Sequence, residues 1–225
     1  MPGLYKVKVE LSRFDPEREE PRYRQQVEVD VEGESTLLDI LLTIQEQIDP
    51  TLAFDFGCRF KNCGLCGIMV NGTPRLACLT KVNEDEEKLT IAPLANFPVV
   101  RDFVIDRGPL LNLLEKAECY PSDGETPIDV IPEQAVFVEF SKCRECLLCM
   151  ALCDQFGNNG ADFGGPFIFV RLAQLQLDPR DKKDRGSQAL SFGIDRCKDC
   201  GGCSCRFGVP IKKAIAILSG GQPLS

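Results

Sequence analysis

Apolar and polar residues alternate in two early segments of the chain. The alternating apolar positions are Tyr5, Val7, Val9 and Leu11 in the first segment and Val27, Val29 and Val31 in the second. A period of two residues is typical of strands with one buried face. Because a charged, proline-containing stretch separates the two segments, the pattern predicts a β-hairpin.

The next segment changes to helical spacing. Its apolar residues recur every three or four positions, at Leu37, Leu38, Leu41, Leu42, Ile44 and Ile48. Ser35 or Thr36 can cap this helix, and Asp49-Pro50 ends it. The pattern predicts one helix that packs across the sheet.

Two further strands flank Asn71-Gly72, a dipeptide that favours a tight hairpin turn. They are expected at Gly67–Val70 and Arg75–Cys78, and Leu89–Ala92 supplies another strand. Two hairpin regions around one helix indicate a β-grasp domain, which we assign to residues 1–105.

The second half of the chain differs in composition. Three prolines lie between Glu118 and Gln134, which indicates a linker or surface crossing. Helical spacing returns in Val136–Phe140, Phe167–Leu177 and Ile211–Leu218, with groups of cysteines between them. Residues 106–225 are therefore expected to form a helical domain organised around its cysteines.

The amino-acid composition excludes several kinds of site and partner. The chain has 13 Cys and no His or Trp, so it has no imidazole for a zinc site, a proton shuttle or a Ser-His nucleophile. Its net charge is -8 without a basic block, which argues against nucleic acid as a partner. The N-terminus lacks a secretory pattern and no apolar run approaches the roughly 20 residues of a membrane span. We expect a cytoplasmic chain whose thiols bind metal rather than form disulfides.

The first cysteine group has the spacing C-x4-C-x2-C, followed by a fourth cysteine after eleven further residues. Its members are Cys58, Cys63, Cys66 and Cys78. This is the plant-type ferredoxin arrangement for a 2Fe-2S cluster. Gly57, Gly64 and Gly67 allow tight turns and bring backbone N–H groups near the sulfurs. A zinc knuckle is the alternative, but zinc usually takes two separated C-x2-C pairs.

Two later groups are similar to those of bacterial two-cluster ferredoxins. They are Cys143, Cys146, Cys149 and Cys153, and then Cys197, Cys200, Cys203 and Cys205. In such proteins the fourth cysteine of a run ligates the other 4Fe-4S cluster. Cys153 is therefore expected to join Cys197, Cys200 and Cys203, and Cys205 to join Cys143, Cys146 and Cys149.

Two cysteines do not fit regular spacing. Cys205 follows Cys203 after a single residue, where the bacterial run has three residues and then proline, so it is the least regular ligand of the set. Cys119 stands alone beside the linker, and we interpret it as an inert thiol. The expected fold class is α+β: an N-terminal β-grasp 2Fe-2S ferredoxin-like domain followed by an α-helical dicluster domain that resembles bacterial ferredoxins.

These residues, in this order, resemble the iron-sulfur subunit of the fumarate reductase and succinate dehydrogenase family. The stretches that carry the likeness are CRFKNCGLCGIMVNGTPRLAC, LANFPVVRDFVID, CRECLLCMALCDQFG, GGPFIFVRLAQLQLDPRD and RCKDCGGC. The Cys-Asp-Gln-Phe-Gly run after Leu152 is closer to fumarate reductases. The resemblance implies electron transfer between an FAD flavoprotein subunit and quinone at a cytochrome b-type membrane anchor, on the cytoplasmic side of the membrane. It also implies that succinate and fumarate react on the flavoprotein, so that this chain has no catalytic residue.

Two positions depart from the family pattern. Much of the family has a non-cysteine residue at the position of Cys200 and a three-iron third cluster, so Cys200 predicts a second 4Fe-4S cluster rather than a 3Fe-4S cluster. A changed cluster type shifts the reduction potential, which makes ubiquinone a less certain partner. Lys198 stands where succinate dehydrogenases often place a quinone-site histidine.

Three alternatives stay open. The first is a complex in which a soluble cysteine-rich subunit, thiol- or ferredoxin-linked, replaces the membrane anchor. The second is an electron-transfer subunit for another flavoenzyme that reduces an activated double bond. The third is a structural protein with zinc in its cysteine groups.

Overall fold

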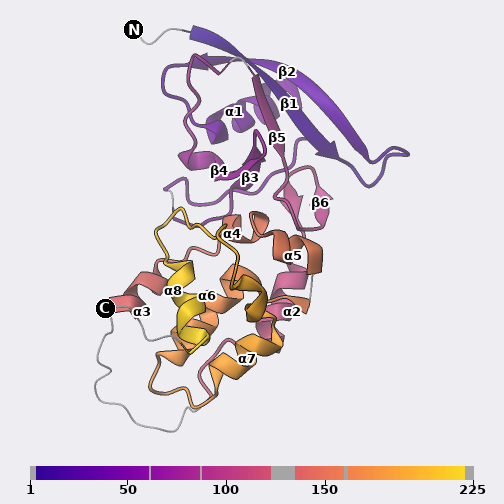
Figure 1. Ribbon diagram of the computed structural model, residues 1–225. Coiled ribbons are helices and arrows are strands. Elements are labelled where there is room, and N and C mark those ends of the chain that lie inside the picture. Colours follow the sequence, from indigo (N-terminus) through magenta and orange to yellow (C-terminus); the bar gives the residue numbers. More distant parts are fainter. Residues whose placement is uncertain (1–3, 61, 87, 123–134, 160–161, 221–225) are drawn as a thin grey trace. The chain divides into compact units, whose positions relative to one another are not determined.

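The computed structural model describes residues 4–60, 62–86, 88–122, 135–159 and 162–220. The chain divides into two compact units (Figure 1). The first comprises Met1–Asp106 together with Glu145–Ala151, and the second comprises Arg107–Arg144 and Leu152–Ser225. The division expected after residue 105 lies one residue from the observed boundary, whereas residues 145–151 were expected in the second domain and group with the first.

The first unit is built on a five-stranded mixed sheet. Its strands are β1 (Leu4–Phe14), β2 (Arg22–Glu32), β3 (Gly67–Val70), β4 (Thr73–Leu76) and β5 (Lys88–Ala92). The strand order is β2-β1-β5-β3-β4 (Figure 1). Only the β1 and β5 pair is parallel, and the other three pairs are antiparallel. This topology confirms the predicted β-grasp arrangement and the predicted β1–β2 hairpin.

The alternation of apolar and polar residues in the sequence distinguishes the buried face of the sheet from the polar face. Val7, Val9 and Leu11 of β1 are buried, while on the other face Lys6 and Lys8 are exposed and Glu10 is covered but ion-paired. Successive side chains of a strand point to opposite faces. One face of the sheet therefore meets the core and the other is polar.

Helix α1 (Leu37–Thr43) begins at Thr36 and buries its apolar positions against the core. The Thr36 hydroxyl accepts a hydrogen bond from the Asp39 backbone N–H, and the Asp39 carboxylate accepts one from the Thr36 N–H. This reciprocal capping box satisfies two backbone donors that the helix leaves unpaired. Thr36, not Ser35, is thus the cap, and a π-helical turn (η1, Ile44–Ile48) extends the helix to Asp49 as predicted.

One predicted strand is displaced by two residues towards the N-terminus: β4 covers Thr73–Leu76. The strand expected over Arg75–Cys78 ends at Leu76, because the chain turns there into a 3-10 turn (η2, Ala77–Leu79). The Ala77 N–H donates to the carbonyl of Cys66 at 2.9 Å. Cys78 therefore projects from a turn that is tied directly to the loop carrying Cys66.

The segment Glu145–Ala151 belongs to the first unit because it packs against its strands. It contains the short helix α4 (Leu148–Ala151), which contacts β4. The Asn96 side-chain amide donates to the carbonyls of Met150 and Ala151 at 3.0 and 3.3 Å. A Cβ at Gly67 would lie 3.1 Å from the carbonyl oxygen of Cys146, so glycine permits this close approach of two backbones.

The second unit is helical. Its helices are α2 (Gly108–Lys116), α3 (Ala135–Ser141), α5 (Asp154–Asn159), α6 (Gly165–Gln176), α7 (Arg185–Ser191) and α8 (Ile211–Leu218), with a 3-10 turn η4 (Ile194–Cys197). Helix α6 is the most buried and contacts α3, α7 and α8. The structure confirms the helices predicted in α3, α6 and α8. No helix of the described residues is long and apolar enough to cross a membrane.

Arg185 fixes the chain that follows α2. Its buried guanidinium forms an ion pair with Asp181 and donates to the carbonyls of Glu118 and Tyr120 at 3.1 and 2.8 Å. A buried charge is tolerated where it is paired and hydrogen-bonded in this way. Most of the predicted linker, residues 123–134, lies outside the described residues.

Candidate metal centres

The first cysteine group lies in the loop that leads into β3. The Cys58 sulfur accepts backbone hydrogen bonds from Phe60 at 3.3 Å, Asn62 at 3.3 Å and Cys63 at 3.2 Å. These three donors, with the Asn62 N–H as the largest contribution, lower the pKa of the Cys58 thiol to about 7. The loop thus favours a thiolate at Cys58, the form in which cysteine binds metal.

The four members of this group are connected in series, from Cys58 through Cys63 and Cys66 to Cys78. The Cys58 N–H donates to the Cys63 sulfur at 3.5 Å, and Cys63 in turn acts electrostatically on Cys66. Burial raises the pKa of the Cys66 thiol to about 12, although the backbone N–H of Cys78 donates to its sulfur. The structure therefore links all four thiols of the predicted set into one group.

A tight loop is required here, and Gly57 permits it. A Cβ at this position would lie 3.1 Å from Leu65 Cδ1 and 3.4 Å from the Cys63 sulfur. The Leu65 side chain would have to shift by a few tenths of an ångström, whereas the sulfur of the candidate ligand Cys63 would be at van der Waals contact. The predicted role of this glycine in crowding three thiols into one loop agrees with the geometry.

In the second unit the structure brings together Cys153, Cys197, Cys200 and Cys203. Burial raises the pKa of the Cys197 thiol to about 12, and the thiols of Cys203, Cys153 and Cys200 shift it in the same direction. Burial also raises the pKa of Cys203 to about 11, with Cys153 and Cys200 again contributing. The thiol just before α5, the thiol at the end of η4 and the two thiols in the loop after η4 thus interact mutually, in the combination that the cross-over of ligands predicts.

Three charged side chains border this group, and the cysteine spacing did not reveal them. Asp154 and Asp195 oppose ionisation of Cys153 and Cys197, whereas Lys212 on α8 favours ionisation of Cys203. Cys200 is the exposed member of the group. Its exposure leaves one side of the site open to solvent.

The remaining set is Cys143, Cys146, Cys149 and Cys205. Cys146 and Cys149 belong to the first unit and Cys143 and Cys205 to the second. Glu145 and Leu147, on either side of Cys146, both have positive φ values, 53° and 62°. Cys205 accepts a hydrogen bond from the Phe207 N–H at 3.4 Å. That these four residues share one cluster stays a prediction from their spacing.

Cys119 lies apart from these sets. Burial raises the pKa of its thiol to about 11, against the opposing influence of Arg185 and Arg171. Unlike the pKa values of Cys66, Cys197 and Cys203, that of Cys119 is not shifted by any neighbouring thiol. The inert role expected for it agrees with this environment.

The chemistry of the donors fits iron-sulfur clusters. Each described group offers four thiols and backbone N–H donors to sulfur, the combination that holds and tunes such clusters. Within the described ranges, no three Cys, Asp or Glu side chains converge closely enough to hold a single metal ion. Thiolates that ligate different irons of one cluster need no such convergence.

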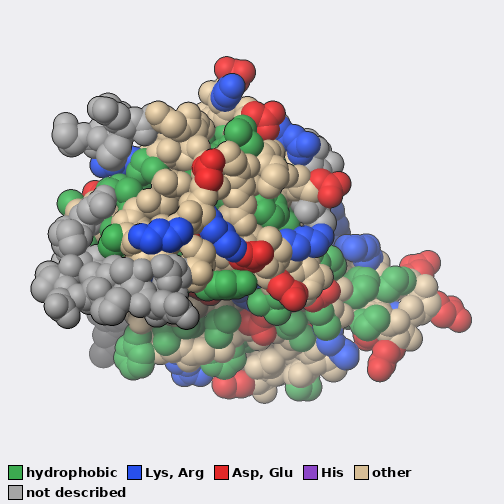
Figure 2. Space-filling view, turned by 90° about the horizontal axis from the view of Figure 1, so that it is seen from below, with side chains coloured by type: hydrophobic (Ala, Val, Ile, Leu, Met, Phe, Trp, Pro, Cys, Tyr) green, Lys and Arg blue, Asp and Glu red, His purple; other side chains and the backbone are tan. Residues whose placement is uncertain are grey.

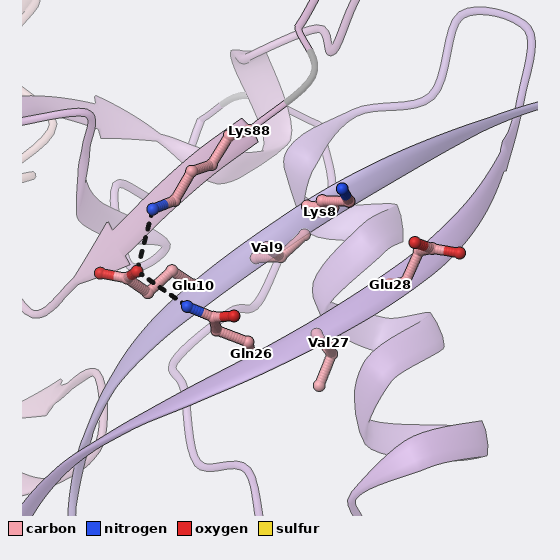
Figure 3. Close-up of a pocket in the computed structure, with 7 residues that line it drawn as sticks. All are labelled: Lys8, Val9, Glu10, Gln26, Val27, Glu28 and Lys88. Carbon is pink, nitrogen blue, oxygen red and sulfur yellow. Dashed lines mark hydrogen bonds and ion pairs between the residues drawn. The ribbon is translucent and has the colours of Figure 1, made fainter.

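A hollow of about 290 Å³ lies elsewhere, on the polar face of the sheet (Figure 3). Residues of β1, β2 and β5 line it, and Glu10 at its edge forms ion pairs with Arg24 and Lys88. No cysteine lines this hollow. Within it, Lys88 and Gln26 donate hydrogen bonds to the Glu10 carboxylate.

Charged side chains of both signs lie on one face of the molecule. On the face in Figure 2, Lys and Arg side chains lie among Asp and Glu side chains. Nucleic-acid sites show a clustered basic patch or stripe. That nucleic acid is not a partner stays a prediction from the net charge of -8.

Comparisons with known proteins place these features in context. A family described as "2Fe-2S iron-sulfur cluster binding domain" matches residues 8–112. The chain is 34% identical to the "Fumarate reductase iron-sulfur subunit" of Escherichia coli O6:H1, over 98% of this chain and 93% of that protein. It is 30% identical to the "8-methylmenaquinol:fumarate reductase iron-sulfur subunit" of Wolinella succinogenes, over 95% of this chain and 71% of that protein.

A solved structure agrees with the sequence relatives. A chain of the "Mycobacterium smegmatis Sdh1 complex in the apo form" superposes with a TM-score of 0.80 at 30% identity. The match covers 99% of this chain and 100% of that chain. Both units thus have counterparts in one known protein chain.

Proposed function

Because the chain belongs to the family of iron-sulfur subunits of fumarate reductase and succinate dehydrogenase, we propose that it relays electrons between an FAD flavoprotein subunit and a quinone-linked membrane anchor. The observation that carries the proposal is the association of thiols into two groups of four, at spacings typical of iron-sulfur ligands. Both groups lie within a chain that matches its relatives almost end to end.

Three clusters are proposed. Cys58, Cys63, Cys66 and Cys78 would hold a 2Fe-2S cluster. Two 4Fe-4S clusters would be held by the following residues: Cys143, Cys146, Cys149 and Cys205 for one, and Cys153, Cys197, Cys200 and Cys203 for the other. When bound, such clusters accept and release single electrons, and the chain's own residues set how readily they do so.

The protein residues act through thiolates, hydrogen bonds and charge. The three N–H donors to the Cys58 sulfur favour the more negative, reduced state of the proposed 2Fe-2S cluster. The carboxylates of Asp154 and Asp195 disfavour added negative charge at the cluster proposed beside Cys153. We propose no catalytic residue in this chain, since the dicarboxylate would react on the flavoprotein.

The quinone-linked partner is supported by one relative whose name includes 8-methylmenaquinol. We propose a menaquinol-type electron carrier and a cytochrome b-type anchor, with this chain on the cytoplasmic side of the membrane. A four-iron rather than a three-iron terminal cluster would shift the reduction potential at this end of the chain.

A second candidate function rests on Cys200. This cysteine completes a set of four at the third cluster and is exposed. A soluble, cysteine-rich subunit that is thiol- or ferredoxin-linked could dock there in place of the membrane anchor. The two candidates share the flavoprotein and differ in the partner at this end.

Both candidate functions require iron-sulfur clusters in this chain. Elemental analysis of the anaerobically purified chain tests this requirement. The proposal requires iron and acid-labile sulfide in the proportion set by one 2Fe-2S and two 4Fe-4S clusters. EPR of the reduced protein should show all three clusters as redox-active. Zinc without labile sulfide would contradict an electron-transfer role.

A further inference from the structure

Phe60 is exposed on one side and tied to a candidate ligand on the other. Its side chain is 85% exposed, the largest value among the bulky apolar residues that the structure describes. Its backbone N–H donates to the Cys58 sulfur at 3.3 Å. One residue thus offers an uncovered aromatic ring to the surroundings and a hydrogen bond to a sulfur that would bind iron.

Other apolar side chains in the same loop are also uncovered. Phe56 and Leu65 are 36% and 39% exposed. Leu65 Cδ1 and the Cys63 sulfur lie close to the same point beside Gly57, so this apolar side chain borders a second candidate ligand. The Arg59 guanidinium lies 5.3 Å from the centre of the Phe56 ring and adds a positive charge. We call Phe56, Phe60 and Leu65, with Arg59, the loop patch.

Apolar residues that gather beside functional ligands mark surfaces that a partner covers. Aromatic side chains serve most often as the anchors of such interfaces. The relatives of this chain are subunits of complexes, and a partner that exchanges electrons must come close to the cluster. The apolar ring and the adjacent cation therefore fit an apolar pocket with an acidic rim.

The hydrogen bonds from this loop also affect the cluster. Hydrogen bonds to ligand sulfurs and solvent exposure set the reduction potential of iron-sulfur clusters. The donors at Phe60 and Asn62 belong to a surface loop, where backbone hydrogen bonds open readily. Holding the Phe60 ring would hold its N–H on the sulfur as well.

We propose that Phe60 anchors the chain in an apolar, acid-rimmed pocket of the flavoprotein subunit, and that this docking raises the reduction potential of the 2Fe-2S cluster by fixing the N–H donors on the Cys58 sulfur. The inference rests on the proposed function and deepens it. It assigns Phe60 as a positioning residue that couples assembly to the electron affinity of the first cluster.

The test uses cluster-loaded chain and flavoprotein subunit, purified anaerobically and then assembled. The variants are Phe60→Ala, which removes the ring, and Phe60→Leu, which keeps an apolar side chain. Leu4→Ala is the matched control, because Leu4 is 65% exposed in the same unit but lies at the start of β1. Before assembly, all variants should keep the cluster content and the 2Fe-2S potential of the wild-type chain, since every backbone donor is retained.

After assembly, Phe60→Ala should bind the flavoprotein roughly tenfold or more weakly, as for loss of an aromatic anchor. At saturating flavoprotein, an EPR-monitored titration should give its 2Fe-2S cluster a lower potential than in the wild-type complex. Phe60→Leu should restore most of both properties, and Leu4→Ala should match the wild type. Unchanged affinity, or an unchanged potential in the saturated Phe60→Ala complex, would overturn the inference.

If the proposed function itself were wrong, the experiment would give a different result. It would appear in the wild type, as a chain without clusters or one that binds no flavoprotein. A wild-type complex that assembles and transfers electrons, with a Phe60→Ala variant that behaves identically, would remove only the role assigned to Phe60.

Discussion

The guanidinium Nε of Arg13 donates to the Asp102 Oδ1 at 2.8 Å, and both side chains are almost completely buried. Asp102 follows β6 (Val99–Arg101) and precedes β7 (Val104–Ile105), with a positive φ of 44°. Its carboxylate also accepts from the backbone N–H groups of Phe14 and Ala53. This ion pair therefore ties β1 to the end of the first unit.

Replacing Asp102 with Ala should destabilise the first unit strongly. The change leaves the Arg13 charge buried and partly unpaired, which costs about 3–5 kcal/mol in the free energy of unfolding. Denaturant unfolding of the cluster-loaded chain, followed by circular dichroism, measures this. Glu28→Ala is the control, because it removes the exposed ion pair of Lys6 and should change stability little. Equal midpoints for the two variants would contradict the role given to the buried pair.

Replacing Arg185 with Met should destabilise the second unit by a similar amount. Asp181 would remain buried without its partner, and carbonyls after α2 would lose their donors, a cost of about 3–5 kcal/mol. Limited proteolysis and denaturant unfolding report the change. Lys183→Ala is the matched control: it removes an ion pair with Glu118 in which both side chains are partly exposed, so it should have a much smaller effect. A wild-type cleavage pattern in Arg185→Met would show that the pair does not fix this segment.

Cys200→Ser should change the third cluster alone. Serine at this position would leave Cys153, Cys197 and Cys203, so the four-iron cluster should convert to a three-iron form. EPR of the oxidised variant should show the three-iron signal, which the intact anaerobic wild type should lack. A three-iron signal of full intensity in the wild type would mean that Cys200 is not a ligand.

Cys205→Ser tests the cross-over of ligands. We expect loss or alteration of the cluster assigned to Cys143, Cys146 and Cys149, with the other two clusters unchanged. Cys119→Ser is the matched control and should preserve all three, because this thiol lies apart from the groups. If Cys205→Ser retains every cluster with wild-type spectra, the proposed ligand set is wrong at that position.

Much of the fold could be predicted from local patterns in the sequence. The period of two in β1 and the helical period after Thr36 arise from burial of one face, so the sequence shows them directly. The cysteine spacing likewise anticipated the association of Cys153 with Cys197 and Cys203, which are far apart in the chain. The ligands of one cluster must lie close together in the fold, and the cysteine spacing along the chain reflects this requirement.

Features that depend on long-range contacts could not be read in this way. The early end of β4 depends on the bond from the Ala77 N–H to the Cys66 carbonyl. The grouping of residues 145–151 with the first unit depends on Asn96 and on the close approach at Gly67. The exposure of Phe60 depends on how the loop turns around the Cys58 sulfur, which spacing alone does not determine.

Anaerobic purification of the native complex from its source, with mass spectrometry of every co-purifying subunit, tests the central claim most directly. The account predicts a flavoprotein subunit and a small membrane subunit with several spans. A flavoprotein with a soluble, cysteine-rich subunit instead of the anchor would contradict the quinone-linked relay and favour a thiol- or ferredoxin-linked complex.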